Sequence, residues 1–544
     1  MLLTPICIIT WGLAIPIIFN NLYPMSFRID RPKGVKLLLL VSSVLIFSGC
    51  YEEIEIDTRY PDSYLKFSDI YAGIDFDKGW VLLPVIKEEM KNYCPSIRTN
   101  LYNLNIGGRE YSDGDRLNLS GMLIGDSVSI YFVDETGAQF YGYLYFTTLP
   151  VIQIYCSSPI PDEPEVLCDF ILSDNTGEKS YSIFSKAGIE LRGRSALSRP
   201  KKCYGIELWE DESGIIKRKE TLLSMRKDDD WILDAMYIDK SRMRNKVSME
   251  LWKDICASSR FKNVYGKPYT QSKFIELFLN SQYKGLYCIS ERYDRKQLDL
   301  THFDGSLNGV LYKSESWTNT TKFTSLADTS VSKLWDGWEQ KYPDPEEYIC
   351  WRPLYNYADF VIHSSDSEFI QEFSDYHNLD NLIDYFLFIN ISCAFDNMGI
   401  NMIYARRSKN SCFVIYPWDL DATWGRNWNS TYIDEEYLLS NRMFNRFFEL
   451  NVNASNPHLQ MRWNELRQKI ITHDSLMSRF IGYYHLITES GAINREKIYW
   501  SEMSLDLSDE MAYIDSWLEN RIQYLDDIIQ NAENIDWEKN GSEN

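Results

Sequence analysis

The stretch from residue 384 to 426 constrains the fold of this chain more than any other. It reads DYFLFINISCAFDNMGINMIYARRSKNSCFVIYPWDLDATWGR. The pattern predicts an apolar helix over Tyr385–Ile391, followed by a polar turn, two short strands and an acidic corner at Asp419. Asp396 and Asn401 stand five positions apart in the turn. Both residue types are common in turns, so this spacing gains meaning only from the rest of the chain.

Length and composition limit the classes of protein that fit. The 544 residues suffice for two or three domains, and 44% of them are apolar. The formal net charge of −22 argues against binding to nucleic acid, because such proteins concentrate positive charge. The 11 cysteines form no C-x-x-C pair and the 6 histidines form no H-E-x-x-H, so neither a zinc site nor a disulfide scaffold is indicated. P-loop and G-x-S-x-G motifs are also absent from the sequence.

The N-terminus has the features of an export signal. Residues 1–24 are apolar and precede a second methionine, Met25, so translation starts at either Met1 or Met25. After Met25 come a basic segment and the apolar run LLLLVSSVLIF, and then Phe47, Ser48, Gly49 and Cys50. Small residues before a cysteine resemble the lipobox of bacterial lipoproteins, although Phe47 stands where Leu is usual. We expect residues 1–50 to be a leader and Cys50 to be lipidated, which predicts an exported, membrane-anchored lipoprotein. An uncleaved N-terminal anchor is the alternative.

Residues 51–150 have the pattern of antiparallel strands. Apolar and polar positions alternate in segments such as DSVSIYFVDETG and AQFYGYLYFTTLP, and Gly-Gly, Asp-Gly and Thr-Gly pairs mark the turns. This pattern predicts a small all-β sandwich of the immunoglobulin-like kind. No cluster of titratable residues stands out, so we expect a spacer or docking module.

From residue 151 to 535 the pattern mixes strands with helices, which predicts an α+β domain. Apolar residues recur every fourth position from Met243 to Ile255 and predict a helix over 241–255. KFIELFLNSQYKGLYCISERYD predicts a hairpin with its turn at 280–285. Residues 316–380 appear irregular in sequence. The chain beyond Arg442 is helical in pattern, and residues 536–544 are expected to be a disordered tail.

Several blocks of this domain together resemble the spore-coat protein H (CotH) kinase family. In chain order they are LPVIQI, IELRGRSALSRPKKCYGIEL, DDDWILDAMYIDKSRMRNKVSMEL, FIELFLNSQYKGLYCISERYDR, FDNMGINMIYARR and VIYPWDLDATWGR. The likeness covers roughly residues 148–530. It implies an atypical protein-kinase-like domain with a helical C-terminal part. The lipobox and the sandwich resemble lipoproteins of Gram-negative gut bacteria that carry this domain.

The resemblance implies roles for the residues of the opening stretch. A kinase catalytic loop has a base Asp, an Asn five residues later for metal, and a metal-binding Asp after the next strands. Asp396 is then the candidate base, while Asn401 and Asp419 supply the hard oxygens that Mg²⁺ prefers. Asp421 shares a face with Asp419 and is the second candidate for the metal. Relatives often carry Lys before the Asn, where this chain has Ile400.

The resemblance also implies a phosphate-binding half of the site further upstream. Strand alternation with Ile206 and Leu208 places Lys202 on the apolar face and Lys201 opposite. One of these lysines would bind phosphate, with Glu250 as its partner on the helix. The residues expected to contact the nucleotide are Arg192, Arg194 and Ser195 in a phosphate-covering loop, Glu250 beside the lysine, and Glu291 near the adenine.

These expectations favour an exported, lipid-anchored kinase that moves the γ-phosphoryl group of ATP to a Ser or Thr hydroxyl of an unknown protein, using Mg²⁺. The first alternative is a catalytically silent surface protein that uses the same fold to bind a partner protein, host ligand or glycan. A glycosidase that pairs Asp419 with Glu276 is a third hypothesis, without a motif to support it.

Overall fold

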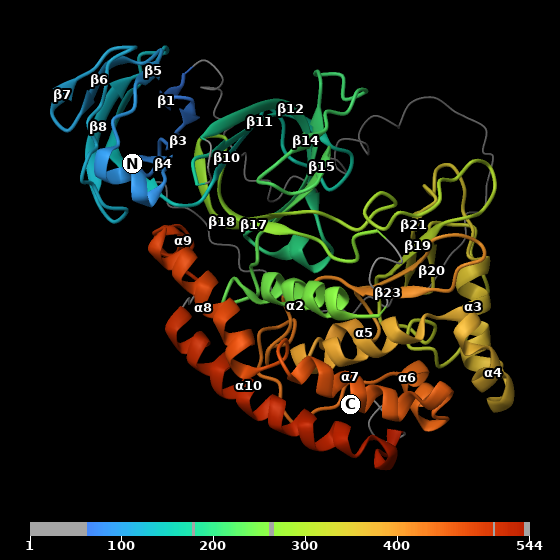
Figure 1. The fold of residues 1–544 in the computed structure, drawn as a ribbon. Helices are drawn as coiled ribbons and strands as arrows, with labels where there is room; N and C mark the ends of the chain where they lie inside the picture. The colour runs from blue at the N-terminus through green and yellow to red at the C-terminus, as the bar shows by residue number, and fades with distance from the viewer. Residues whose placement is uncertain (1–62, 177–179, 261–265, 504–505, 538–544) are drawn as a thin grey trace, which may run out of the picture. The chain divides into compact units, whose positions relative to one another are not determined.

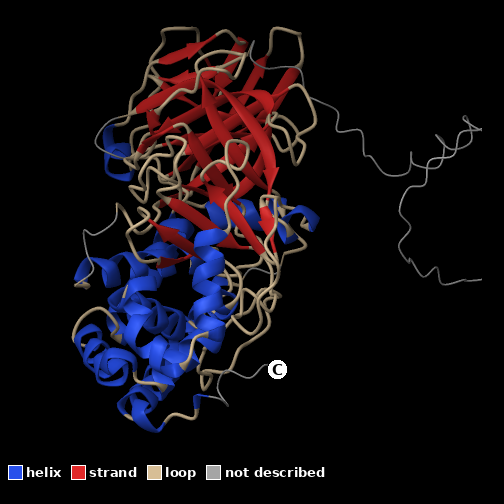
Figure 2. Cartoon of the chain, turned by 90° about the vertical axis from the view of Figure 1, so that its right-hand side faces the viewer, coloured by secondary structure: helices blue, strands red, loops and turns tan. Residues whose placement is uncertain are grey.

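The computed structural model describes residues 63–176, 180–260, 266–503 and 506–537. The predicted lipobox, Cys50 and most of the C-terminal tail lie outside these ranges, so lipidation stays a prediction. Strands dominate the N-terminal half and helices the C-terminal half (Figure 2), which confirms the α+β class. Within the described ranges, no helix has the length and apolarity required to cross a membrane.

The first region is rich in sheet, as predicted, and contains two sheets that share one apolar core. Phe67, Val81, Phe132 and Phe146 are completely buried in that core. The sheet orders are β2-β1-β5 and β3-β4-β9-β8-β6-β7. Strands β4 and β9 run parallel, so the purely antiparallel arrangement that we predicted is wrong. The strands are β1 (Leu65–Phe67), β2 (Ile70–Tyr71), β3 (Gly73–Asp75), β4 (Trp80–Pro84), β5 (Ile97–Thr99), β6 (Tyr102–Ile106), β7 (Arg109–Glu110), β8 (Ser127–Val133) and β9 (Gln139–Thr147).

The second region is a closed barrel of seven strands in the order β10-β11-β12-β13-β16-β18-β17. A parallel pairing of β10 with β17 closes it. Alternate residues such as Ile154, Ile206 and Trp231 point into an apolar interior, since all are at most 1% exposed. The barrel strands are β10 (Val151–Cys156), β11 (Val166–Asp174), β12 (Tyr181–Arg192), β13 (Cys203–Trp209), β16 (Asp230–Asp234), β17 (Ser272–Leu279) and β18 (Gln282–Ser290). The short strands β14 (Glu220–Thr221) and β15 (Lys227–Asp228) form a separate pair.

The predicted hairpin is β17 followed by β18. Its turn is only two residues long, and both Asn280 and Ser281 have positive φ, at 49° and 57°. Two such residues match the right-handed twist of the strands, and Asn tolerates this backbone region well. The hairpin expected from the sequence is therefore confirmed, with a tighter turn.

The third region starts with a sheet of order β20-β21-β19-β22-β23, which carries the two strands predicted in the opening stretch. Helices α7, α10 and α2 pack against α5, whose residues from Asn381 to Ser392 are all buried. The strands are β19 (Val310–Ser314), β20 (Leu334–Trp335), β21 (Trp338–Tyr342), β22 (Met402–Arg406) and β23 (Val414–Pro417). The helices are α3 (Arg352–His363), α4 (Asp366–Tyr376), α5 (Leu379–Ser392), α6 (Arg442–Glu449), α7 (Ser455–Arg467), α8 (His473–Glu489), α9 (Ala492–Tyr499) and α10 (Leu507–Gln530).

Helix α2 (Arg244–Ser258) lies between the barrel and the C-terminal helices (Figure 1). Met243, Val247, Leu251 and Ile255 are all fully buried, which confirms the four-residue period read from the sequence. The interpretation of residues 316–380 as irregular is wrong for its second half, because α3 and α4 occupy most of it. Helix α4 begins with a capping box, in which Ser365 and Glu368 satisfy each other's backbone amides.

Candidate functional site

Asn401 and Asp419 lie at neighbouring strand ends. Strands β22 and β23 pair so that Met402 is opposite Pro417, and the amide of Trp418 donates to the carbonyl of Asn401 at 3.0 Å. Asn401 and Asp419 both have left-handed backbone conformations, with φ of 58° and 57°. Asn and Asp adopt this region more readily than most residues. The two candidate metal ligands predicted from the sequence are therefore brought together.

The corner between these strands is fixed by a buried amide, Asn397. Its Nδ2 donates to the carbonyls of Asn401 at 2.9 Å and Trp418 at 3.0 Å. The main-chain carbonyl of Asn397 accepts a 2.8 Å hydrogen bond from the Tyr385 hydroxyl on α5. Asp396 precedes it in the short 3-10 helix η3 (Phe395–Met398). The apolar helix of the opening stretch thus serves to position its polar turn.

The side chains of Asp396, Asn401, Asp419 and Asp421 form the acidic corner. Its carboxyl groups make one another's charged forms less favourable. Burial, followed by the charge of Asp419, raises the pKa of Asp396 to about 6. Burial and the charges of Asp419 and Asp234 raise the pKa of Asp421 well above its usual value. Asp419 is exposed to solvent, yet enough protein surrounds its carboxyl group for burial to raise its pKa as well. Carboxylates in such a group gain from a bound cation.

The same side chains lack partners from the protein. Within the described ranges, Asp396, Asn401, Asp419 and Asp421 take part in no side-chain hydrogen bond or ion pair. Polar groups that are partly buried normally find protein partners, so the partly buried Asp396, Asn401 and Asp421 beside the exposed Asp419 indicate a ligand site.

Lys313 is a neighbour of this corner that the sequence reasoning missed. It lies on β19, opposite Ile403, and its charge lowers the pKa of Asp419, which is raised overall by burial. Its ammonium group pairs with Glu315 at 2.7 Å. The sequence did contain a signal for this neighbour, because the oppositely charged Lys313 and Glu315 stand at the end of the apolar segment VLYKS.

The open end of the barrel faces the acidic corner. The charge of Arg192, at the end of β12, also lowers the pKa of Asp419, so the predicted nucleotide loop starts beside the metal candidates. Arg194 follows it and donates to the carbonyl of Glu315 at 2.5 Å and to the hydroxyl of Ser316 at 2.7 Å. Ser195 is exposed at the start of the next helical turn. The loop expected to cover phosphates therefore spans from the barrel to β19.

Asn245 connects the barrel to the acidic corner from below. Its amide nitrogen donates to Asp234 on β16 at 3.3 Å, and its carbonyl oxygen accepts from the amide of Leu420, also at 3.3 Å. Leu420 separates Asp419 from Asp421. One side chain at the start of α2 thus ties both halves of the candidate site together.

The predicted arrangement of the two lysines is wrong. Strand β13 begins only at Cys203, so its alternation does not extend back to Lys202. Lys202 is partly buried and donates to the carbonyl of Leu197 at 2.6 Å. Lys201 points inward and is 1% exposed. Neither ammonium group has a contact with the acidic corner.

Lys201 is paired with a different glutamate from the one we predicted. Its Nζ lies 2.8 Å from Oε1 of Glu496 on α9, and Arg242 lies 3.1 Å from the same oxygen. Glu250 instead accepts a hydrogen bond from Tyr483 and lies 3.5 Å from Lys246. Burial, together with the charge of Arg242, outweighs Glu496 and lowers the pKa of Lys201 to about 8.

Two further carboxylates that we selected are structural. Glu291 is fully buried and accepts hydrogen bonds from the amides of Arg226 and Gln271 and from Lys267, so it has no oxygen left for adenine. Glu276 is also fully buried and binds Arg495 at 2.7 Å. This enclosure removes the basis of the glycosidase hypothesis, since a catalytic acid must reach its substrate.

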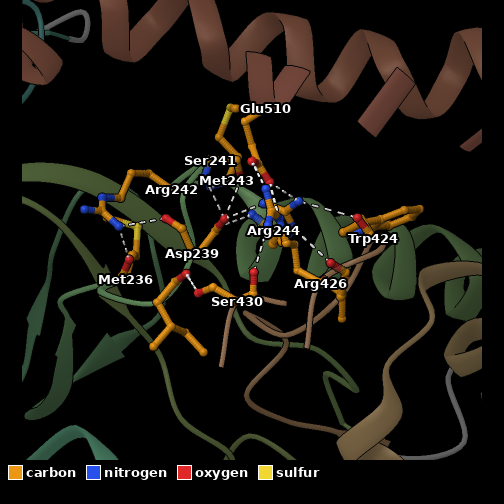
Figure 3. A network of polar contacts seen from close by, with 12 residues as sticks. Met236, Asp239, Ser241, Arg242, Met243, Arg244, Trp424, Arg426, Ser430 and Glu510 are labelled. Carbon is orange, nitrogen blue, oxygen red and sulfur yellow. Dashed lines mark hydrogen bonds and ion pairs between the residues drawn. The ribbon is translucent and has the colours of Figure 1, made fainter. Parts of the chain in front are cut away.

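A buried network fixes the segment that follows Asp421 (Figure 3). Arg244 donates to the carbonyl of Thr423 at 2.8 Å and pairs with Asp239 at 2.8 Å and with Glu510 at 2.5 Å. Glu510 also holds Arg426, at 2.6 Å. Because all of these groups are nearly inaccessible, removing one would leave a buried charge uncompensated. Asp421 is therefore followed by a segment that Arg244 and Glu510 hold in place.

The two tryptophans of this segment differ in environment. Trp424 is fully buried and donates from its indole nitrogen to Ser248 at 2.8 Å. Trp428 is 55% exposed and lines a cavity of about 320 Å³ together with Arg199, Tyr237 and Lys240. Only Trp428 is accessible to a ligand.

The donor set of the acidic corner fits Mg²⁺ bound together with phosphate. Among the described residues, no group of three or more His, Cys, Asp or Glu side chains is arranged to hold a metal ion. Asn401 and Asp419 offer hard oxygens, and Mg²⁺ commonly takes one or two protein ligands, with waters and substrate phosphates completing its shell. Arg192 and Lys313 are the nearby cations suited to an anionic ligand.

Comparisons with known proteins identify the family of the chain. The family model described as CotH kinase protein matches residues 189–525. Inner spore coat protein H of Bacillus subtilis (strain 168) is 24% identical over 208 residues, which is 38% of this chain and 53% of that protein. The chain thus aligns with about half of that relative's length. Because the family model matches more than half of the 544 residues, the chain belongs to the CotH kinase protein family.

Proposed function

We propose that this protein is an atypical kinase that transfers the γ-phosphoryl group of ATP to a Ser or Thr hydroxyl of another protein, with Mg²⁺. The observation that carries the proposal is the set of side chains without protein hydrogen bonds or ion pairs in η3 and next to the ends of β22 and β23, namely Asp396, Asn401, Asp419 and Asp421. Family membership supports the same reading.

Each side chain has a role that phosphoryl transfer requires. Asn401 and Asp419 would hold Mg²⁺, with Asp421 as the second candidate, and the bound ion supplies charge neutralisation at the phosphates. Arg192 and Lys313 lie on the phosphate side and offset the remaining negative charge. Arg194 keeps the covering loop closed through its contacts with the end of β19.

Asp396 orients the acceptor hydroxyl and accepts its proton. This role requires the carboxylate form, and a pKa of about 6 leaves most of the group ionised at neutral pH. The same raised pKa makes Asp396 a better proton acceptor than an ordinary aspartate. Asp396 lies on η3 directly before Asn397, whose side chain donates to the carbonyl of Asn401. This hydrogen bond fixes the position of Asp396 relative to Asn401.

The purified full chain would test this proposal. We expect Mg²⁺-dependent ATP turnover and self-phosphorylation, and a loss of both in Asp396→Asn. The matched control is Asp375→Asn, an aspartate exposed on α4, which should retain full activity. Absence of turnover, together with absence of an ATP-induced rise in melting temperature in a folded sample, would exclude the kinase activity.

We also propose that the protein is exported and anchored through a lipid on Cys50. The support is the signal-like segment and the lipobox-like Phe47 to Cys50 in the sequence. Palmitate labelling of the wild type, absent in Cys50→Ala, would be the expected result. Labelling that persists in Cys50→Ala would contradict the anchor.

A catalytically silent binding protein is the second candidate. The observation that favours it is Lys201, whose ammonium group is enclosed with Glu496 and away from the acidic corner. Ile400, which stands where relatives often carry Lys, also favours this candidate. This candidate predicts that Mg²⁺ and ATP raise the melting temperature without any turnover, and that Asp419→Ala removes the thermal shift.

A further inference from the structure

Two cysteines face each other inside the barrel. Cys156 on β10 and Cys168 on β11 are directly opposite in the antiparallel register. Both point into the apolar interior, with exposed fractions of 6% and 2%. In the described strands, no other cysteine has a cysteine as its cross-strand partner. The pair is therefore distinct from the other thiols of the chain.

Hydrogen bonds identify the type of cross-strand pair. The amide of Cys156 donates to Oδ1 of Asn280 at 2.9 Å, and the carbonyl of Ile154 accepts from the amide of Asn280 at 2.8 Å. Both backbone groups thus point toward the end of β17 and away from β11. In an antiparallel ladder this makes Cys156 and Cys168 a non-hydrogen-bonded pair, which brings their Cα atoms to about 4.5 Å.

That spacing suits a covalent link. Disulfides join Cα atoms about 4.4–6.8 Å apart, so this pair lies within the range, at its short end. The two strands are consecutive in sequence and form a hairpin, so the cysteines meet as soon as β10 and β11 pair. Asn280 holds the backbone of Cys156 in place from the opposite side.

We propose that Cys156 and Cys168 form an intramolecular disulfide when the barrel folds in an oxidising environment. In the cell this depends on the proposed export, while in vitro it depends only on the redox buffer. The link would lie outside the acidic corner and would tie the strand that closes the barrel to its neighbour.

The oxidant is a small-molecule or protein disulfide. One cysteine thiolate attacks a sulfur of that disulfide and releases one thiolate, which takes up a proton. The second cysteine thiolate then displaces the other half, which forms the Cys156–Cys168 bond and releases a second thiol. Two protein thiols are oxidised and one external disulfide is reduced to two thiols. Since both sulfurs are buried in the native barrel, the exchange takes place before the barrel closes.

The test compares the full chain refolded with glutathione disulfide and glutathione against the same chain refolded with a phosphine reductant. After alkylation and non-reducing digestion, mass spectrometry should find the peptide of Cys156 joined to that of Cys168. The number of alkylated thiols should fall by two in the oxidised sample. The melting temperature of the oxidised protein should be a few degrees higher.

Variants identify the source of the effect. In Cys156→Ser and in Cys168→Ser, the number of alkylated thiols should no longer fall by two in the oxidised sample. The melting temperature should then be the same in the two buffers. Cys288→Ser, which changes a buried cysteine on β18, a barrel strand that pairs with neither β10 nor β11, should keep both the fall of two thiols and the difference in melting temperature. If a variant fails to fold, the linked peptide of the wild type still decides. Full alkylation of Cys156 and Cys168 in wild-type protein that folded with glutathione disulfide would overturn the proposal.

Discussion

The acidic corner and the ion cluster of Lys201, Arg242 and Glu496 both contain carboxyl groups, but only the carboxyl group of Glu496 is paired with cations. Lys201 and Glu496 have side chains that are 0% exposed and complete each other's hydrogen bonds, with Arg242 as the third member. Asp396 and Asp419 have no such partner within the described ranges, and burial, followed by the charge of Asp419, raises the pKa of Asp396. The first cluster is complete without a ligand, whereas the carboxyl groups of the second form no ion pair with the nearby Arg192 and Lys313.

This difference separates structural from functional charge. Breaking a buried ion pair leaves an uncompensated charge and costs about 3–5 kcal/mol. Removing one carboxylate from a group that repels itself costs little, and can stabilise the fold. A carboxylate-to-amide substitution should therefore have opposite consequences in the two clusters.

Asp419→Asn tests the acidic corner and should have the largest effect. We expect ATP turnover to fall by at least about 10³-fold, because a metal ligand and its charge are lost. The free energy of unfolding should stay equal or rise slightly, since one repelling charge disappears. Turnover assays and urea titrations on the same sample measure both. A large loss of stability would assign Asp419 to the structural class.

Glu496→Gln tests the buried cluster. The amide cannot neutralise Lys201 and Arg242, so we expect the free energy of unfolding to fall by about 3 kcal/mol. Urea denaturation measures the loss, and Glu519→Gln, at an exposed position on α10, serves as the control. A change below about 1 kcal/mol would show that the cluster contributes no more than a surface ion pair.

Lys201→Met should change how stability depends on pH. The pKa of Lys201 is about 8 in the folded protein against 10.5 for an unperturbed lysine, so between these values the unfolded chain binds one more proton. The free energy of unfolding of the wild type, relative to Lys201→Met, should therefore rise with pH across this window, by about 1–3 kcal/mol. Denaturation at pH 7.5 and pH 10 measures the difference. A flat difference would indicate that Lys201 keeps its proton throughout.

Arg194→Ala should have the smallest effect. The arginine is exposed and only ties the covering loop to Glu315 and Ser316, so we expect KM for ATP to rise a few-fold with kcat nearly unchanged. Arg98→Ala, which removes an exposed arginine of the first region, is the control. An unchanged KM for Arg194→Ala would show that this contact of the loop does not contribute to nucleotide binding.

Local patterns predicted the elements that place the site. The four-residue period from Met243 to Ile255 predicted α2, and apolar runs around a polar turn predicted α5, β22 and β23. Asp396, Asn401 and Asp419 were selected as candidates from their spacing and from the family resemblance, and their positions in a turn and at strand ends follow from local patterns. Helix α4 was missed even though Ser365 and Glu368 form a capping box, which is a signal that the sequence contained.

Pairings over long separations could not be predicted in the same way. Lys201 and Lys202 were assigned from alternation, which assumes a strand that in fact starts at Cys203. Glu250 was chosen as the partner because it lies on the nearest helix, whereas Glu496 lies 295 positions from Lys201. No local pattern distinguishes these glutamates, since the choice depends on how α9 packs against the barrel.

The contact between Lys201 and Glu496 has a consequence for the order in which the protein matures. A chain that is still being synthesised contains Lys201 and Arg242 long before it contains Glu496. Until residue 496 arrives, these two cations lack the counter-charge with which they are buried in the complete protein. A product shortened before α9 should therefore be less stable around Lys201 and Arg242, and more susceptible to cellular proteases, than the complete chain.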